Sequence, residues 1–348
     1  MSEPNLIEDG ERAIEIVTRP YAGAFARWAE DRPEVLALSA DLTNSCEIGP
    51  WRDTHPDRFF SFGMGEQNML GFAAGLAREG FRPFVHTFAV FLYRRPYDQL
   101  AMSIAYPNLP VRLVGFLPGI TTPGGVTHQA IEDVAVLRAM PNMTILETGD
   151  ATEVQTVVEA ADSVDGPVYI RMQRGEVPRL FPRDEPFRVG VPRLLSEGDG
   201  VTIITAGVAT EEALRITPLL AGAGISVHHV HVSTHKPFGG EILLDAIRRA
   251  RRGVITLENH TIVGGLGSAV AETIADHGLG QRLIRLGLRD RYAHGASHEF
   301  LVRELGLDAW ALAGAVEELT GEQLGLTEDQ IASVHVGETH NLAKPEAL

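Results

Sequence analysis

The chain alternates between apolar segments of strand length and segments with helical periodicity along most of its length. Strand patterns occupy 34–42, 81–88, 111–119, 143–149, 166–173, 201–207, 225–232 and 253–259, and helical patterns include 22–31, 95–106, 128–140 and 151–162. Such alternation is typical of mostly parallel sheets with helices on both faces. The sequence therefore predicts an α/β fold.

One segment interrupts this alternation. Prolines and charged residues cluster in "RGEVPRLFPRDEPFRVGVPRLLSEGDG", which has no apolar period. We take the break as a domain boundary and predict two α/β domains, 1–185 with an N-terminal tail and 200–348, joined by a linker at 186–199. Residues from about Thr327 onward are expected to form a peripheral helix and a tail.

Composition excludes several classes of function. The 348 residues carry a formal charge of −16, with basic residues that are mostly single or paired, so a nucleic-acid surface is not expected. The single cysteine, Cys46, has no partner for a disulfide and no nearby histidine, which favours a buried thiol. The acidic N-terminus does not resemble a signal peptide, and no apolar run could span a bilayer. These features predict a cytoplasmic protein that binds neither nucleic acid nor membrane.

The stretch "GMGEQNMLGFAAGLA" places a carboxylate, Glu66, at the start of an apolar helical pattern. In most proteins a glutamate in the first turn of a helix simply interacts with the helix dipole and the free N–H groups. Here glycines flank Glu66, and the following strand ends in the apolar "TFAVF". A carboxyl group in such surroundings is expected to have a raised pKa and could donate a proton to a ring nitrogen.

Several motifs together resemble the transketolase family. They are "SADLTNS", "GEQNMLGFAAGLA", "FVHTFAVFLYRRPYDQL", "THQAIEDVAVLRAMPNMTIL", "GPVYIRMQR" and "TLENHTIVGGLGSAVAE", in the family's order and near its spacing. The resemblance covers roughly 18–319. It implies a pyrimidine-binding domain with the thiamine diphosphate-binding fold, followed by a transketolase C-terminal-like domain.

The resemblance also implies a cofactor and the residues that bind it. Thiamine diphosphate becomes nucleophilic through the imino tautomer of its aminopyrimidine, and Glu66 matches the acid that drives this tautomerisation. Phe88 and Phe91 match the apolar slot against which the pyrimidine stacks, although plain core packing is the alternative for both rings. Asp41 matches a position that lines the cofactor, and a helix cap is its alternative.

Substrate contacts carry over in part. His128 in "GGVTHQ" matches the catalytic histidine that contacts oxygens of the donor, although a histidine before a helix often only caps it. Arg19, Ser45 and Arg174 match positions that bind the terminal phosphate of a sugar, where an arginine fork suits a tetrahedral anion. The resemblance therefore implies an anionic sugar substrate.

The loop "FLPGITTPGGVTHQ" departs from the family pattern at two positions. Phe116 stands near the place of a phosphate-binding histidine, and Gly124 replaces an aspartate that holds an acceptor hydroxyl. We expect a more apolar pocket with fewer contacts to a polyol. His86 lies beside the expected cofactor slot, but the sequence assigns it no role.

The resemblance also points to a partner subunit. The family grips the diphosphate through magnesium with "GDG" and an asparagine some thirty residues later, but the "GDG" at 198–200 precedes a strand of the second domain and is followed by "HHVHVST". A chance match of three residues explains it. The chain is thus expected to need an N-terminal transketolase subunit that holds the diphosphate and magnesium, in a heterotetramer with two copies of each.

Two other motifs suggest sites that we reject. In "HHVHVSTH", His229 and His231 share one face of a strand and could begin a zinc site, but no carboxylate or cysteine nearby completes it. We expect solvent-facing histidines and no metal ligands. The glycines of "ENHTIVGGLGSAV" lack the acidic residue of a dinucleotide-binding loop.

The sequence leaves three functions open. The preferred one is a catalytic subunit of a split transketolase that moves a two-carbon ketol unit from a ketose to an aldehyde. The second is a relative of the pyruvate dehydrogenase beta subunit, which passes a two-carbon unit to a lipoyl or carrier-protein thiol. The third is a non-catalytic partner, against which the presence of "GEQN" together with both phenylalanines argues.

Overall fold

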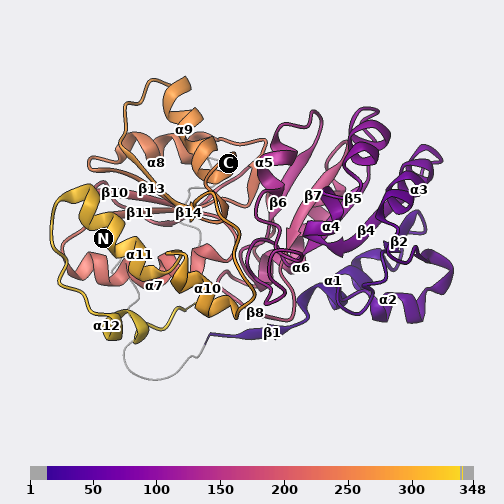
Figure 1. Cartoon of the computed structure of the whole chain (residues 1–348), viewed down its shortest axis with the longest axis horizontal. Coiled ribbons are helices and arrows are strands. Elements are labelled where there is room, and N and C mark those ends of the chain that lie inside the picture. The colour runs from indigo at the N-terminus through magenta and orange to yellow at the C-terminus, as the bar shows by residue number, and fades with distance from the viewer. Residues whose placement is uncertain (1–13, 338, 340–348) are drawn as a thin grey trace.

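The computed structural model describes residues 14–337 and 339. Two α/β domains lie side by side, each built on its own sheet (Figure 1). The α/β class predicted from the alternating pattern is confirmed, and each predicted strand segment overlaps a strand of the structure.

The first domain contains a seven-stranded sheet in the order β12-β6-β7-β5-β4-β2-β3. All neighbouring strands are parallel except β12, which pairs antiparallel with β6. The strands are β2 (Val35–Ser39), β3 (Phe59–Ser61), β4 (Arg82–Phe88), β5 (Arg112–Phe116), β6 (Thr144–Glu147), β7 (Val168–Met172) and β12 (Thr234–Lys236). The helices are α1 (Pro20–Ala29), α2 (Gly49–Thr54), η1 (Pro56–Arg58), α3 (Glu66–Arg78), α4 (Ala89–Tyr93), η2 (Gln99–Ala105), α5 (Asp133–Arg138) and α6 (Ala151–Asp162).

The second domain contains a five-stranded sheet in the order β14-β13-β10-β11-β9. Its strands are β9 (Arg193–Ser196), β10 (Val201–Thr205), β11 (Val227–His231), β13 (Gly253–Thr261) and β14 (Leu283–Leu288). Figure 1 shows α8 (Glu241–Arg249) and α9 (Leu266–Asp276) on one face, with α7 (Ala209–Gly222) and α11 (Ala309–Thr320) on the other. The remaining elements are α10 (His298–Glu304), α12 (Glu328–Ala332) and the antiparallel pair of β1 (Ile16–Thr18) and β8 (Glu176–Pro178).

The segment expected to be a linker, 186–199, contributes β9 to the second sheet, where it pairs antiparallel with β11. The chain then crosses back, because β12 follows β11 directly and extends the first domain's sheet. The two domains are therefore connected by the pairing of β12 with β6 as well as by side-chain contacts.

The expectation of solvent-facing histidines on β11 is wrong, because both side chains are fully buried. His229 Nε2 lies 2.9 Å from Thr205 Oγ1, and His231 Nε2 lies 3.1 Å from Glu153 Oε2 of the first domain. A central strand that ends at the seam between the domains has no solvent-facing side. Polar side chains can occupy such a strand only when buried partners satisfy them.

The candidate site lies at the carboxyl ends of the parallel strands of the first sheet. β2, β4, β5 and β7 run in the same direction, so their carboxyl ends meet at one edge of the sheet. Functional groups in open α/β sheets gather beyond these ends. Asp41, Phe88 and Arg174 each follow or end one of these strands.

Candidate active site

Glu66 begins α3, where glycine at the N-cap position supplies no capping side chain. Its side chain is only 3 % exposed, and Oε1 lies 2.6 Å from Nη1 of Arg95. Arg95 itself is half-exposed. Among the described residues, this buried carboxylate thus has one cationic partner, which is itself half-exposed to solvent.

An aromatic wall lies next to this ion pair. Phe88 ends β4 and Phe91 lies in the helical turn of α4, and their rings are 6.0 Å apart with an interplanar angle of 28°. The Arg95 guanidinium carbon lies 4.0 Å from the centre of the Phe91 ring. One planar cation therefore covers Phe91 while it donates to Glu66.

His128 closes the aromatic wall from the loop that follows β5. Its ring meets Phe91 edge-on at 5.4 Å and Phe88 at 6.1 Å. Nδ1 lies 2.9 Å from Thr127 Oγ1. A Cβ atom added at Gly124 would lie only 2.9 Å from the His128 ring, so the glycine is needed for this packing.

Arg174 extends the same surface beyond Phe88. Its guanidinium carbon lies 5.6 Å from the centre of the Phe88 ring, and Nη1 donates to the Ser45 carbonyl oxygen at 2.8 Å. Arg19 is connected to this surface by a backbone hydrogen bond, in which its N–H donates to the Gly175 carbonyl oxygen at 2.6 Å. The predicted residues thus form a continuous strip from a buried acid, across aromatic rings, to exposed arginines.

Asp41 is the predicted residue that no described contact ties to this strip. It is exposed just beyond β2, in the left-handed region with φ of 58°. It does not cap α2, whose N-cap residue is Ile48. A lining role for Asp41 therefore stays a prediction.

The interpretation of Phe116 as a pocket residue is wrong for this structure. The side chain is fully buried, packing edge-on against Tyr21 at 5.4 Å. It belongs to the core of the first domain and adds no apolar surface to a pocket.

His86, for which the sequence suggested no role, is a buried core residue. Its Nε2 lies 2.7 Å from the Tyr21 hydroxyl and its Nδ1 lies 3.2 Å from the Leu38 carbonyl oxygen. Burial lowers the pKa of His86 to about 4. A neutral imidazole with both nitrogens engaged stabilises the strands beneath the site.

Arg95 and Glu47 are two charged residues of this region that the sequence did not single out. Arg95 had only a weak signal, because α4 ends at Tyr93 and Arg95 lies two positions beyond that end. Glu47 had none. Its buried carboxylate accepts backbone N–H groups of Tyr21 and Gly175, which are 26 and 128 positions away in the chain.

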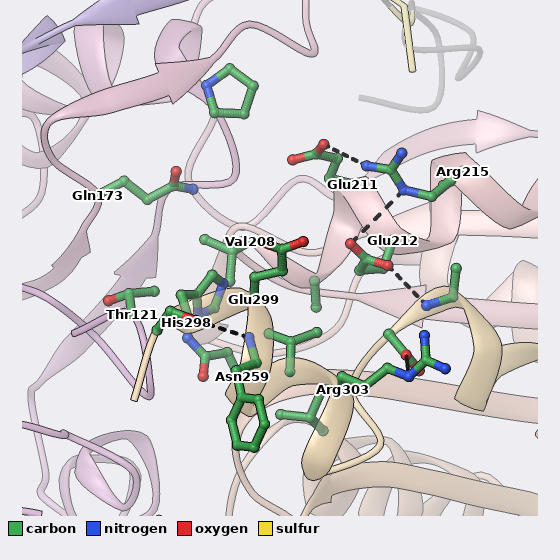
Figure 2. Close-up of a pocket in the computed structure, with 18 of the residues that line it drawn as sticks. Thr121, Gln173, Val208, Glu211, Glu212, Arg215, Asn259, His298, Glu299 and Arg303 are labelled. Atoms are coloured by element: carbon green, nitrogen blue, oxygen red, sulfur yellow. Dashed lines mark hydrogen bonds and ion pairs between the residues drawn. The ribbon is translucent and has the colours of Figure 1, made fainter. Parts of the chain in front are cut away.

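A cavity lined by described residues lies elsewhere, at the seam between the domains. It has a volume of about 970 Å³, and of the predicted residues only Arg174 lines it. Figure 2 shows Arg215 between Glu211 and Glu212 on one side, with His298 and Asn259 grouped on another. The Arg215 charge is already satisfied by Glu211 at 3.0 Å. The strip combines a buried carboxylate, aromatic rings and exposed arginines. We therefore take the strip, and not this cavity, as the candidate active site.

Comparison with known proteins agrees with this fold. Residues 17–179 match the model of the transketolase pyrimidine-binding domain, and residues 190–312 match that of the transketolase C-terminal domain. The two matches correspond to the two α/β domains of the structure, in the same order along the chain.

Two relatives and one solved structure are similar over nearly their whole length. A putative transketolase C-terminal section of Methanocaldococcus jannaschii is 37% identical over 301 residues, 86% of this chain and 94% of that protein. A 6-deoxy-6-sulfo-D-fructose transketolase subunit of a Clostridium species is 36% identical over 86% of this chain and 93% of that protein. A solved split gene transketolase, described as an inactive β4 tetramer, is 35% identical with a TM-score of 0.80, covering 87% of this chain and 98% of that one.

The chain belongs to the transketolase family, and it is an enzyme of the transketolase type, a transferase. Among the described residues, no helix is both long and apolar enough to cross a membrane.

Proposed function

We propose that this chain is the C-terminal catalytic subunit of a split thiamine diphosphate-dependent transketolase. It transfers a two-carbon ketol unit from an anionic ketose to an aldehyde. The observation that carries the proposal is the continuous strip, with the buried Glu66 carboxylate at one end, Phe88, Phe91 and His128 in the middle, and Arg174 at the other.

The residues fit an aminopyrimidine. The Arg95 guanidinium is planar, rests on Phe91 and donates an N–H group to Glu66 at 2.6 Å. A flat, N–H-bearing group therefore suits this place, and an aminopyrimidine offers the same two features. In that role Glu66 exchanges a proton with the ring nitrogen while Phe88 and Phe91 exclude water.

The cofactor, when bound, supplies a stabilised carbanion that carries the two-carbon unit. His128 contributes ring N–H or acceptor contacts to oxygens of the donor sugar, from a ring fixed between Thr127 and the two phenylalanines. Arg174, Arg19 and Ser45 hold the terminal anion at the far end. Phosphate and sulfonate both suit an arginine fork, and the similar Clostridium protein is named for a sulfonated sugar.

We further propose that a separate N-terminal subunit holds the diphosphate and magnesium, in an assembly with two copies of each chain. Two observations support this. Similar proteins are named as a C-terminal section, a subunit and a split gene product. The strip also lies on the open edge of the first domain, where a second chain has access.

The proposal is tested by reconstitution with a partner that carries the diphosphate motif. Calorimetry should show tight, magnesium-dependent binding of thiamine diphosphate to the mixture and weak or no binding to this chain alone. Tight, magnesium-dependent binding by the isolated chain would contradict the split arrangement.

Turnover in the reconstituted complex separates the candidate reactions. Ketol transfer from a phosphorylated or sulfonated ketose to an aldehyde is expected. The pyruvate dehydrogenase-like alternative is kept because no aspartate stands at Gly124 to hold an acceptor hydroxyl. Transfer from pyruvate to a lipoyl thiol, without ketol transfer, would establish that alternative.

A further inference from the structure

Glu47 is a buried carboxylate that connects three separate loops of the first domain. Its side chain lies just below the surface and is 3 % exposed. Oε1 accepts the Gly175 N–H at 2.6 Å, and Oε2 accepts the Tyr21 N–H at 3.3 Å.

Each of these loops carries one of the predicted anion-binding residues. Arg174 immediately precedes Gly175, Arg19 lies two positions before Tyr21, and Ser45 lies two positions before Glu47 itself. Two further hydrogen bonds connect the same loops directly. The Arg19 N–H donates to the Gly175 carbonyl oxygen at 2.6 Å, and Arg174 Nη1 donates to the Ser45 carbonyl oxygen at 2.8 Å. The relative positions of all three residues therefore depend on the carboxylate of Glu47.

The backbone of these loops is strained where it meets Glu47. Arg19 has φ of 49° and Glu47 has φ of 57°, both in the left-handed region that side chains other than glycine rarely adopt. Such conformations persist only where surrounding contacts outweigh their cost, and they concentrate at functional sites. The two hydrogen bonds of Glu47 are contacts of this kind.

The charge of Glu47 is otherwise unfavourable at this place. An anionic side chain beneath an anion-binding surface repels the ligand, and burial raises the pKa of Glu47 against the effect of its two backbone N–H groups and of Arg174 and Arg19. An ionised carboxylate that accepts N–H groups forms stronger bonds than a neutral acceptor does. The carboxylate of Glu47 therefore contributes by fixing the positions of the two backbone segments that it binds.

We propose that Glu47 is a positioning residue for substrate recognition, which fixes Arg19, Ser45 and Arg174 as one cationic mouth for the terminal phosphate or sulfonate of the sugar. This inference rests on the proposed function. It adds a residue that touches neither cofactor nor substrate and acts through the loops that do.

Three variants test the proposal in the reconstituted complex. Glu47→Ala removes both acceptors, whereas Glu47→Gln keeps one of them and removes the charge. Glu176→Gln is the matched control, because Glu176 is an exposed residue two positions after Arg174 whose carboxylate forms no hydrogen bond or ion pair among the described residues. It removes the same charge near the mouth without loosening a loop.

A positioning role predicts a split between kinetic constants. KM for the anionic ketose should rise at least tenfold in Glu47→Ala and by less in Glu47→Gln, with kcat changed by less than about threefold, because the mouth lies away from the reacting carbon. The Glu176→Gln control should leave KM unchanged or lower it. If Glu47→Gln lowered KM as the control does, Glu47 would act only as a repelling charge and the proposal would be overturned.

A second measurement does not depend on catalysis. Sulfate titrated into the full chain and followed by NMR should bind more weakly to Glu47→Ala and Glu47→Gln than to the wild type. Equal sulfate binding by all three would overturn the role of Glu47. Absence of ketol transfer in the wild-type complex would instead refute the proposed function, while the titration would still decide on Glu47.

Discussion

Two buried carboxylates of this protein have an arginine at nearly the same distance, and their surroundings give them different capacities. Glu66 Oε1 lies 2.6 Å from Arg95, and Glu147 Oε1 lies 2.5 Å from Arg171. Arg171 is 1 % exposed, whereas Arg95 is 47 % exposed. The second oxygen of Glu147 also lies 2.6 Å from His235 Nε2.

Glu147 belongs to a closed network at the domain seam. Although its burial raises the pKa, the Arg171 charge and the His235 hydrogen bond hold the pKa of Glu147 at about 2. Arg171 also binds Asp133 at 2.9 Å. If one member of this network moved away, another buried charge would lose its partner. Arg95, in contrast, can move into solvent and leave Glu66 accessible. A buried charge is available for chemistry when its partner is replaceable.

The first prediction tests this difference with matched variants. Arg171→Met should lower the free energy of unfolding by about 3–5 kcal/mol, because it leaves the buried carboxylates of Glu147 and Asp133 without a cation. Arg95→Met should cost about 1 kcal/mol or less, as expected for a half-exposed pair. Urea denaturation of both variants measures the two changes in the free energy of unfolding. Similar changes would show that Glu66 and Glu147 depend equally on their arginines.

The second prediction concerns His86, which lies two positions before Phe88 but faces the core. Burial lowers its pKa to about 4, whereas an unfolded histidine titrates near 6.5. As the pH falls from about 6.5 to 4, the unfolded chain gains a proton that the folded chain does not, so this contribution to stability is complete above that window and is lost within it.

His86→Gln should therefore make the fall in stability shallower, by up to about 1.4 kcal/mol per pH unit between pH 6.5 and 4.5. Other titrating groups contribute equally to both proteins and cancel in the difference. Urea midpoints of the two proteins at pH 7, 5.5 and 4.5 measure this difference in the pH dependence of stability. Parallel pH profiles would mean that the pKa of His86 is the same in the folded and the unfolded state, and would contradict the prediction.

The third prediction concerns Gly124, which packs closely against the His128 ring. An aspartate at this position would restore the family residue, but its Cβ would lie 2.9 Å from the His128 ring. Even Gly124→Ala should displace His128 by a few tenths of an ångström, so we expect kcat/KM to fall about tenfold with folding unaffected. Unchanged kinetics would show that the position of His128 is not critical.

The sequence predicted the parts of the site that follow from local pattern. Strand and helix periodicity placed β2, β4, β5 and β7, and with them the edge at which Phe88 and Arg174 lie. The motif around Glu66 predicted a buried acid at a helix start, and the structure buries it.

Contacts between distant segments could not be predicted in this way. Glu47 depends on Gly175, and His231 on Glu153 of the other domain, so neither environment appears in the local sequence. Phe116 was misplaced for the same reason, because its ring packs against Tyr21 on α1, a segment far away in the sequence. Strand β9 was hidden in a proline-rich segment, and only its pairing with β11 reveals it.

The central claim is that Glu66 drives proton exchange in the cofactor, and exchange at the thiazolium carbon tests it most directly. Glu66→Gln keeps the size of the side chain but cannot release a proton, so in the reconstituted complex the exchange rate should fall by a factor of about 10² to 10⁴, or roughly 3–5 kcal/mol in the barrier. Cofactor affinity should change much less. Hydrogen–deuterium exchange followed by NMR decides between the outcomes: a large loss supports the account, and exchange at the wild-type rate would contradict it.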